Sequence, residues 1–239
     1  MARTYRALAA LLSYPTEALQ AAAGEIAEVL ADEAIVAAPQ RAAIQTFLDE
    51  VTATDIYELQ ERYFALFDRS RTLSLHLFEH IHGESRDRGQ AMADLITLYQ
   101  NHGLDMAAGE LPDFLPLFLE FLSLLPESEA RTMLGEPAGI LRALTDRLAA
   151  RNTGYMTVMA ALADIAAAPM LAMSDIPQEN PNDLEAMDAA WEEAVVRFGP
   201  GEAVDACGTD RLRNQIRAGQ RDARKNTAAG VPARNIAAA

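Results

Sequence analysis

The chain has 239 residues, which is enough for one domain with a sizeable core, or for one domain with an added tail. A formal net charge of −15 argues against partners such as nucleic acid or anionic lipid and favours basic ones, although an acidic surface also simply aids solubility. The single cysteine, Cys207, excludes an internal disulfide and fits a reducing compartment. Because no apolar run approaches 18 residues, we expect no stable membrane insertion and a cytoplasmic location.

Helices are expected throughout the chain. Half of the residues are apolar but only 6% are aromatic, and alanine and leucine, which lose little side-chain freedom in a helix, dominate the apolar set. Apolar spacing, prolines, glycines and capping residues predict helices up to about residue 13 and then over 16–34, 39–51, 54–67, 73–82, 85–102, 112–125, 128–134, 137–150 and 155–168. The expected fold is all-α, with a single globular helical domain of about ten helices.

The C-terminal part differs in composition. A Pro-rich loop precedes a short helix predicted over 183–193, and we assign residues 1–198 to the helical domain. Residues 199–239 are rich in Gly, Ala and Arg and read as a flexible tail, disordered or marginally helical. From Arg197 onward there are eight basic and four acidic residues, whereas residues 1–196 hold 12 basic and 31 acidic ones. The tail is therefore a candidate to fold back on the acidic body.

One short string invites an enzymatic interpretation. The residues from His76 to His80 read H-x-x-E-H, which occurs in zinc peptidases, and a helix would place both histidines on one face with Glu79 as general base. Five letters match often by chance, however, and no third ligand stands in a recognisable motif. A hydrogen-bonded histidine at the edge of the core explains the pattern better. With no nucleophile motif and no phosphate-binding loop, we predict no catalytic residues, no metal site and no enzyme.

A second cluster, Glu110-Leu-Pro-Asp-Phe-Leu-Pro-Leu-Phe-Leu-Glu-Phe121, combines an apolar stripe with acidic residues. It is either an ordinary buried helix with capping acids, or one wall of an acidic-rimmed apolar groove that takes a basic amphipathic helix. Periodicity alone does not choose between these interpretations.

Three segments together resemble the NarJ family of nitrate reductase assembly chaperones. They are Leu11-Leu-Ser-Tyr-Pro-Thr-Glu17, the block from Tyr63-Phe-Ala-Leu-Phe-Asp-Arg69 through Leu73-Ser-Leu-His-Leu-Phe-Glu-His-Ile-His-Gly-Glu to Met92, and the cluster 110–121. The segment 184–193 is weakly similar to a later part of the family, and the resemblance covers about residues 5–198. It implies a helical chaperone that binds the basic N-terminal region of the catalytic (alpha) subunit of a respiratory nitrate reductase and assists insertion of the molybdenum cofactor before membrane attachment.

The resemblance also implies that the chaperone binds no permanent cofactor, since the client handles the molybdenum cofactor, and that proteins of molybdenum cofactor biosynthesis are further partners. An acidic body with an apolar groove would complement a basic peptide. We expect the peptide to contact Tyr63, Phe67 and Leu119, a polar edge of His76, Glu79 and His80, and a second edge of Glu110, Asp113 and Glu120. The alternatives are a chaperone for another molybdoenzyme, such as an S-oxide or N-oxide reductase, a helical adaptor with an unrelated partner, and the zinc hydrolase.

Overall fold

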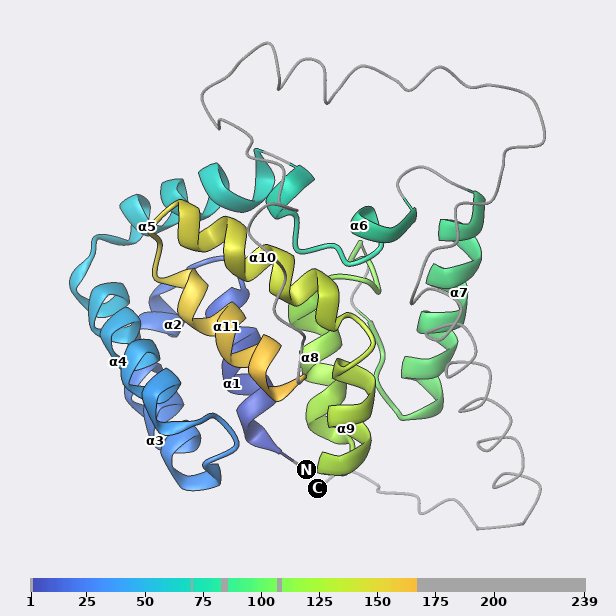
Figure 1. Ribbon diagram of the computed structural model, residues 1–239, viewed down its shortest axis with the longest axis horizontal. Helices are drawn as coiled ribbons and strands as arrows, with labels where there is room; N and C mark the ends of the chain where they lie inside the picture. Colours follow the sequence, from blue (N-terminus) through green and yellow to red (C-terminus); the bar gives the residue numbers. More distant parts are fainter. Residues whose placement is uncertain (1, 70, 83–85, 107–108, 167–239) are drawn as a thin grey trace, which may run out of the picture.

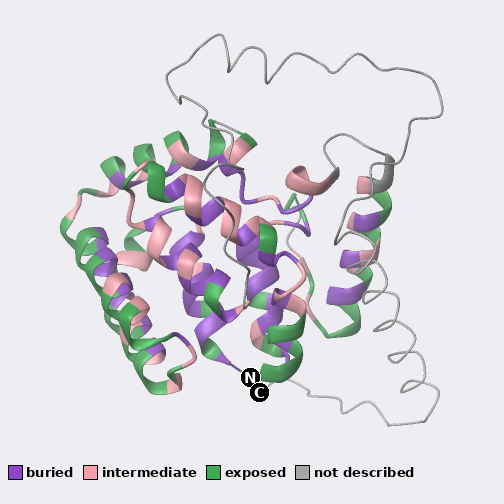
Figure 2. Ribbon diagram, in the orientation of Figure 1, coloured by how far each residue is buried: buried purple, intermediate pink, exposed green. Residues whose placement is uncertain are grey.

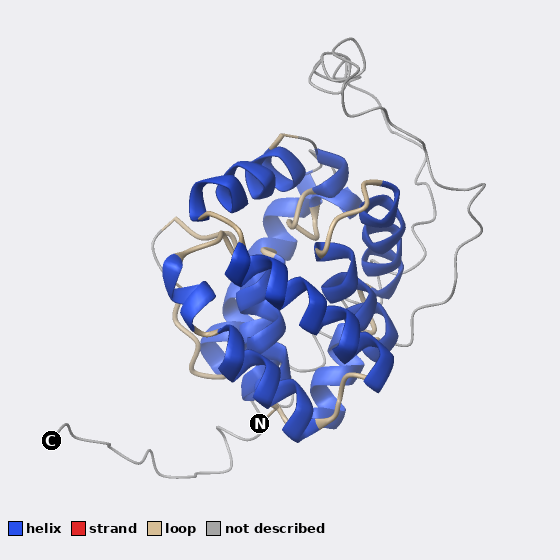
Figure 3. Ribbon diagram, turned by 90° about the vertical axis from the view of Figure 1, so that its left-hand side faces the viewer, coloured by secondary structure: helices blue, strands red, loops and turns tan. Residues whose placement is uncertain are grey.

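The computed structural model describes residues 2–69, 71–82, 86–106 and 109–166. Within these ranges every regular element is a helix, and a single isolated bridge pairs His76 with Phe114, so the all-α prediction is confirmed (Figures 1 and 3). The predicted helix over 183–193 and the tail 199–239 lie outside the described residues. The elements are α1 (Arg3–Leu12), α2 (Glu17–Ala21), α3 (Ala23–Glu33), α4 (Ala38–Ala53), α5 (Ile56–Tyr63), the π-helix η1 (Phe64–Asp68), the 3₁₀ turn η2 (Arg71–Leu73), α6 (Glu79–His82), α7 (Arg86–Asn101), α8 (Leu115–Leu124), α9 (Glu127–Leu134), α10 (Ala138–Ala150) and α11 (Tyr155–Ile165).

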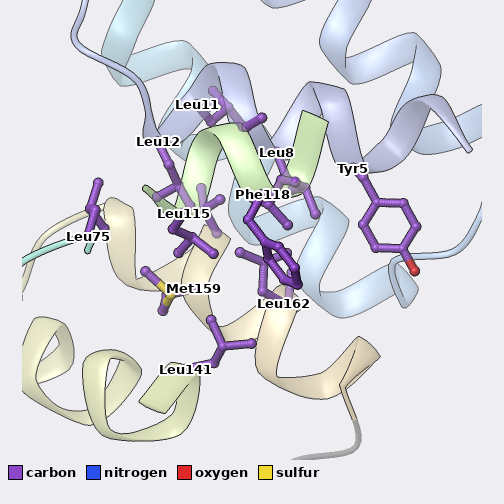
Figure 4. Close-up of a cluster of buried hydrophobic side chains, with 14 of the residues drawn as sticks. Tyr5, Leu8, Leu11, Leu12, Leu75, Leu115, Phe118, Leu141, Met159 and Leu162 are labelled. Carbon is purple, nitrogen blue, oxygen red and sulfur yellow. The ribbon is translucent and has the colours of Figure 1, made fainter. Parts of the chain in front are cut away.

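Helices α1, α8 and α11 form the centre of the molecule. Most of their side chains are buried, and only a narrow strip of each helix, including Arg6 of α1, Glu120 of α8 and Asp164 of α11, is exposed (Figure 2). Figure 4 shows where they meet, with Leu8 and Leu12 of α1 against Leu115 and Phe118 of α8 and Leu162 of α11. Helices α3 and α4 pack on one flank, and α10 packs antiparallel to α11. The chain therefore encloses one continuous core.

A carboxylate from another helix caps the start of α1. Glu33, the last residue of α3, accepts hydrogen bonds from the backbone N–H groups of Arg3 and Thr4 at 2.9 and 2.8 Å and from the Thr4 hydroxyl at 2.8 Å. Burial alone would raise the pKa of Glu33, but these hydrogen bonds outweigh it and hold the pKa below its usual value. This tertiary cap satisfies N–H groups that no local residue of the sequence reaches.

The predicted helix over 16–34 is two helices, α2 and α3. The Gln20 side chain donates hydrogen bonds to the carbonyls of Val51 and Thr54, both at 2.8 Å, which ties α2 to the end of α4. Helix α3 instead runs along α1 and α4. The two directions meet at Ala22, where no proline or glycine marks the break.

The prediction of one helix over 73–82 is wrong. Leu73 ends η2, residues 74–78 are irregular, and only the four residues of α6 are α-helical. The Leu77 N–H donates to the carbonyl of Asp113 at 3.0 Å, and the Leu75 carbonyl accepts from the Leu115 N–H at 2.8 Å. These bonds to a distant segment replace the local helical ones. They also delay the start of α8 from the expected residue 112 to Leu115.

Helix α7 lies at the edge of the molecule (Figure 1). Its Tyr99 packs on Phe121 of α8 with ring centroids 4.8 Å apart, and the Tyr99 hydroxyl donates to the Pro112 carbonyl at 2.7 Å. None of the described helices has both the length and the apolar character needed to cross a membrane.

Candidate functional site

Two of the expected contact residues, Tyr63 and Phe67, belong to a buried aromatic cluster. Their rings lie 4.8 Å apart, and each contacts the ring of Tyr155 at the start of α11, at 6.0 and 5.1 Å. Phe47 of α4 completes the cluster at 4.8 Å from Tyr155. Because both are buried, Tyr63 and Phe67 are placed behind the molecular surface and not on it.

The tyrosines of this cluster stay neutral. Burial raises the pKa of Tyr63 and of Tyr155 far above the usual value, and nearby carboxylates, Asp68 and Glu50 respectively, raise it further. The Tyr63 hydroxyl donates to the carbonyl of Leu12 at 3.0 Å, and Gln60 donates to the Pro15 carbonyl at 3.0 Å. These two bonds tie the first segment of the family resemblance, 11–17, to the start of the second at Tyr63 and to Gln60 just before it.

A pocket of about 440 Å³ opens over the aromatic cluster, between α4, the α5–η1 rod and the turn before α11. Its lining combines an apolar floor with polar groups, and consists of Phe47, Glu50, Leu59, Arg62, Ala65, Leu66, Arg151, Asn152, Thr153 and Tyr155. Arg62 is held by Glu50 at 2.8 Å and by Glu58 at 2.5 Å. An apolar side chain fits this floor, and a basic group next to it would meet the exposed Glu50 carboxylate.

Gly154 brings the turn before α11 close to this pocket. A Cβ atom at this position would fall on the ring of Phe47, so only glycine allows the approach. Sequence reasoning found neither Phe47 nor Tyr155 as site residues. The local signal is the Thr153-Gly154-Tyr155 triplet, with a glycine directly before an aromatic residue at a helix start.

The remaining polar candidates gather around Asp113. This carboxylate is completely buried, accepts a hydrogen bond from the Phe78 N–H at 3.1 Å and contacts His76 Nδ1 at 3.3 Å. Arg88 of α7 lies 3.9 Å from Asp113 and 3.6 Å from Glu79, which places Glu79 in the same group. We call His76, Glu79, Arg88 and Asp113 the polar knot. It joins the segments 73–82 and 110–121, so the carboxylate of Asp113 is not on the exposed rim where we expected it.

His80 lies beside the polar knot. Its Nε2 is 2.8 Å from the carbonyl of Ser74, and because a carbonyl only accepts, Nε2 carries the proton in this contact. Burial lowers the pKa of His80, and the positive charge of Arg147 lowers it further. The hydrogen bond to Ser74 acts in the opposite direction but does not cancel the lowering. His80 is thus a neutral structural donor.

The last three candidates are Leu119 and Glu120 in α8 and Glu110 shortly before this helix. Leu119 is completely buried, whereas Glu120 beside it and Glu110 before the helix are exposed. Among the described residues no hydrogen bond or ion pair connects Glu110 or Glu120 to the polar knot. The nine candidates therefore divide into two residues of the aromatic cluster, three of the polar knot together with His80, two exposed acids, and the buried Leu119.

The zinc interpretation loses its geometric basis. His76 precedes α6 and forms the bridge with Phe114, so it does not share a helix face with His80. In the part of the chain that the structure describes, no three His, Cys, Asp or Glu side chains gather as a metal site requires.

Comparison with known proteins shows which family this chain is similar to. Residues 16–161 match the family of nitrate reductase delta subunits. The chain is 43% identical over 192 residues to the nitrate reductase molybdenum cofactor assembly chaperone NarJ of Escherichia coli K12, covering 79% of this chain and 81% of that protein. It is 39% identical over 175 residues to the probable assembly chaperone NarW of the same strain, covering 72% and 75%. The probable NarJ of Bacillus subtilis 168 is 28% identical over 156 residues, covering 65% and 84%.

Proposed function

This chain belongs to the nitrate reductase delta subunit family of NarJ-type assembly chaperones, and we propose that it binds the basic N-terminal region of the catalytic subunit of a respiratory nitrate reductase. Binding would last while the client receives its molybdenum cofactor and would precede attachment of the enzyme to the membrane. The observation that carries the proposal is the 43% identity, over four fifths of both chains, to a chaperone named for this assembly. The relatives reported above are all named for nitrate reductase, which favours this client over an S-oxide or N-oxide reductase.

The pocket beside η1 supports the recognition step. We propose that an apolar side chain of the client peptide enters between Leu59, Leu66 and Tyr155, while a neighbouring basic residue pairs with Glu50. Tyr63 and Phe67 then act from behind, as the packed support of the pocket.

The other candidates have different roles in this proposal, according to how far each is exposed. Glu110 and Glu120 are exposed and attract the basic peptide through charge, and His76, Glu79 and His80 are partly exposed along one edge. Asp113 and Leu119 are buried, so we assign them support of that edge and not contact.

The molybdenum cofactor is the client's cargo in this account, and the chaperone needs no resident cofactor. Delivery would bring proteins of molybdenum cofactor biosynthesis into contact with the complex, and the work would take place in the cytoplasm.

Molybdenum content tests the function directly. In a strain that lacks this chain, the purified nitrate reductase catalytic subunit should carry little molybdenum, and expression of the chain should restore it. A second molybdoenzyme of the same strain is the control and should stay loaded, because the chaperone serves one client. Full molybdenum content without the chain would contradict the proposal.

A further inference from the structure

The α5–η1 rod exposes an aromatic face to solvent. Tyr57 is 78% exposed and Phe64 is 54% exposed, although both are large apolar side chains. Tyr57, Glu61 and Phe64 follow one another at helical spacing of four and three residues, and Asp68 lies one turn further. We call these four residues the outer face. Large apolar side chains gathered in water are unfavourable, and such patches mark sites of association.

The π-helix is a second feature of this surface. The Arg69 N–H bonds to the Phe64 carbonyl at 3.2 Å, five residues back, which closes the wide turn. π-Helices are rare, and single π turns occur frequently at functional sites. Here Tyr63 and Phe67 are both buried while Phe64 between them is exposed. The ring of Tyr63 is covered in part by Tyr14, which is half exposed and lies 5.5 Å from it.

The outer face also carries negative charge. Glu61 and Asp68 are both exposed and flank Phe64 on its two sides along the rod. The basic neighbour Arg62 is engaged by Glu50 and Glu58 and so is already compensated. Among the described residues neither Glu61 nor Asp68 forms an ion pair. The surface thus combines aromatic side chains with exposed carboxylates, which suits a basic segment with apolar residues at helical spacing.

The same chain contains such a segment. Residues 210–225 hold six basic and two acidic residues, and Leu212 and Ile216 are four apart. The 44 residues between Ala166 and Arg211 give a contour of up to about 150 Å, enough to reach any side of the domain. We propose that residues 210–225 dock on the outer face of their own chain, with Leu212 and Ile216 on the aromatic rings and the arginines near Glu61 and Asp68.

Charge favours this occupant over a second copy of the protein. Two copies with a net charge of −15 each repel one another, whereas the tail segment is positive and the body is negative. Tethering also gives the segment an effective local concentration in the millimolar range, so weak contacts suffice. The inference does not depend on the identity of the client.

Photo-crosslinking in the full-length chain tests this docking. With the photoreactive residue benzoylphenylalanine in place of Phe64, light should join position 64 to residues 210–225 of the same molecule. The same residue in place of Leu124, which is exposed on α8, is the matched control and should not reach this segment. The double substitution Glu61→Lys and Asp68→Lys should abolish the position-64 product.

A mixture of light and heavy isotope-labelled protein separates contacts within one molecule from those between molecules. Products confined to one isotope form and mapping to 210–225 support the proposal. Mixed-isotope products, equal products from positions 64 and 124, products at other residues, or no product at position 64 would each overturn it.

Discussion

At the scale of single residues, Asp113 shows how burial changes the role of a side chain. In the sequence it is one of several acids around an apolar stripe, and an exposed capping or rim position is the natural expectation. In the structure the carboxylate is completely buried, and the Phe78 N–H, His76 and Arg88 surround it. A carboxylate in this position is stabilising only because its partners compensate the cost of removing it from water.

Removal of this carboxylate should be costly. We predict that Asp113→Ala lowers the free energy of unfolding by about 3 kcal/mol, because it removes the buried carboxylate that accepts the Phe78 N–H and faces Arg88. Denaturant titration measures this, with Glu120→Ala as control, since loss of an exposed acid should change stability by less than about 0.5 kcal/mol. Equal effects of the two substitutions would show that Asp113 does not hold the two segments together.

His80 should make stability depend on pH. Its pKa is lowered in the folded chain, mainly by burial, so the unfolded chain binds a proton first as pH falls below about 6.5. Stability should therefore fall between pH 7.5 and 5.5, and this component should vanish in His80→Gln, which keeps a donor for Ser74 but does not titrate. Identical pH profiles of the melting temperature in both proteins would exclude His80 as the source.

At the scale of elements, the contact between α4 and the start of α11 rests on Gly154. Its φ of −59° suits any residue, so alanine would ordinarily be tolerated or favourable there. The ring of Phe47 occupies the space that a Cβ needs. We predict that Gly154→Ala lowers stability by about 1–3 kcal/mol.

The cause of that loss is testable by a double-mutant cycle. In the background Phe47→Leu, which removes the ring, the cost of Gly154→Ala should shrink markedly. The same cost in both backgrounds would mean that the backbone, and not the ring, makes position 154 intolerant.

The pocket between α4, the α5–η1 rod and the turn before α11 allows a matched pair of charge reversals. Glu50 lines the pocket, whereas its neighbour Asp49 is exposed on α4 and does not. We predict that Glu50→Lys weakens binding of the client's N-terminal peptide roughly tenfold, about 1.4 kcal/mol, by calorimetric titration. Asp49→Lys changes the net charge equally and should have a much smaller effect. Equal weakening would place recognition elsewhere on the acidic surface.

At the scale of the whole molecule, the helical class and most helix positions could be predicted because Ala, Leu and the capping residues act locally. The segment 74–78 could not, because its N–H and carbonyl groups bond to Asp113 and Leu115, more than 35 residues away. The break at Ala22 depends likewise on Gln20 reaching the end of α4. The pocket was missed for the same reason, since Phe47, Leu59 and Tyr155 come from three separate helices.

The three segments of the family resemblance also gain a physical meaning at this scale. Tyr63, at the start of the second segment, and Gln60 just before it bond to Leu12 and Pro15 of the first segment, and the polar knot joins the second segment to the third. The motifs that identify the family thus stabilise the fold around the pocket. Several of the residues that we expected to touch the client are buried beneath the surface of this protein.

Calorimetric titration of the full-length protein with a synthetic peptide from the N-terminus of the same organism's nitrate reductase catalytic subunit tests the central claim most directly. The account predicts saturable, near one-to-one binding that is weakened when the basic residues of the peptide are replaced by alanine. Absence of binding by the folded protein, or equal binding of a scrambled peptide of the same composition, would contradict recognition of the client through this region.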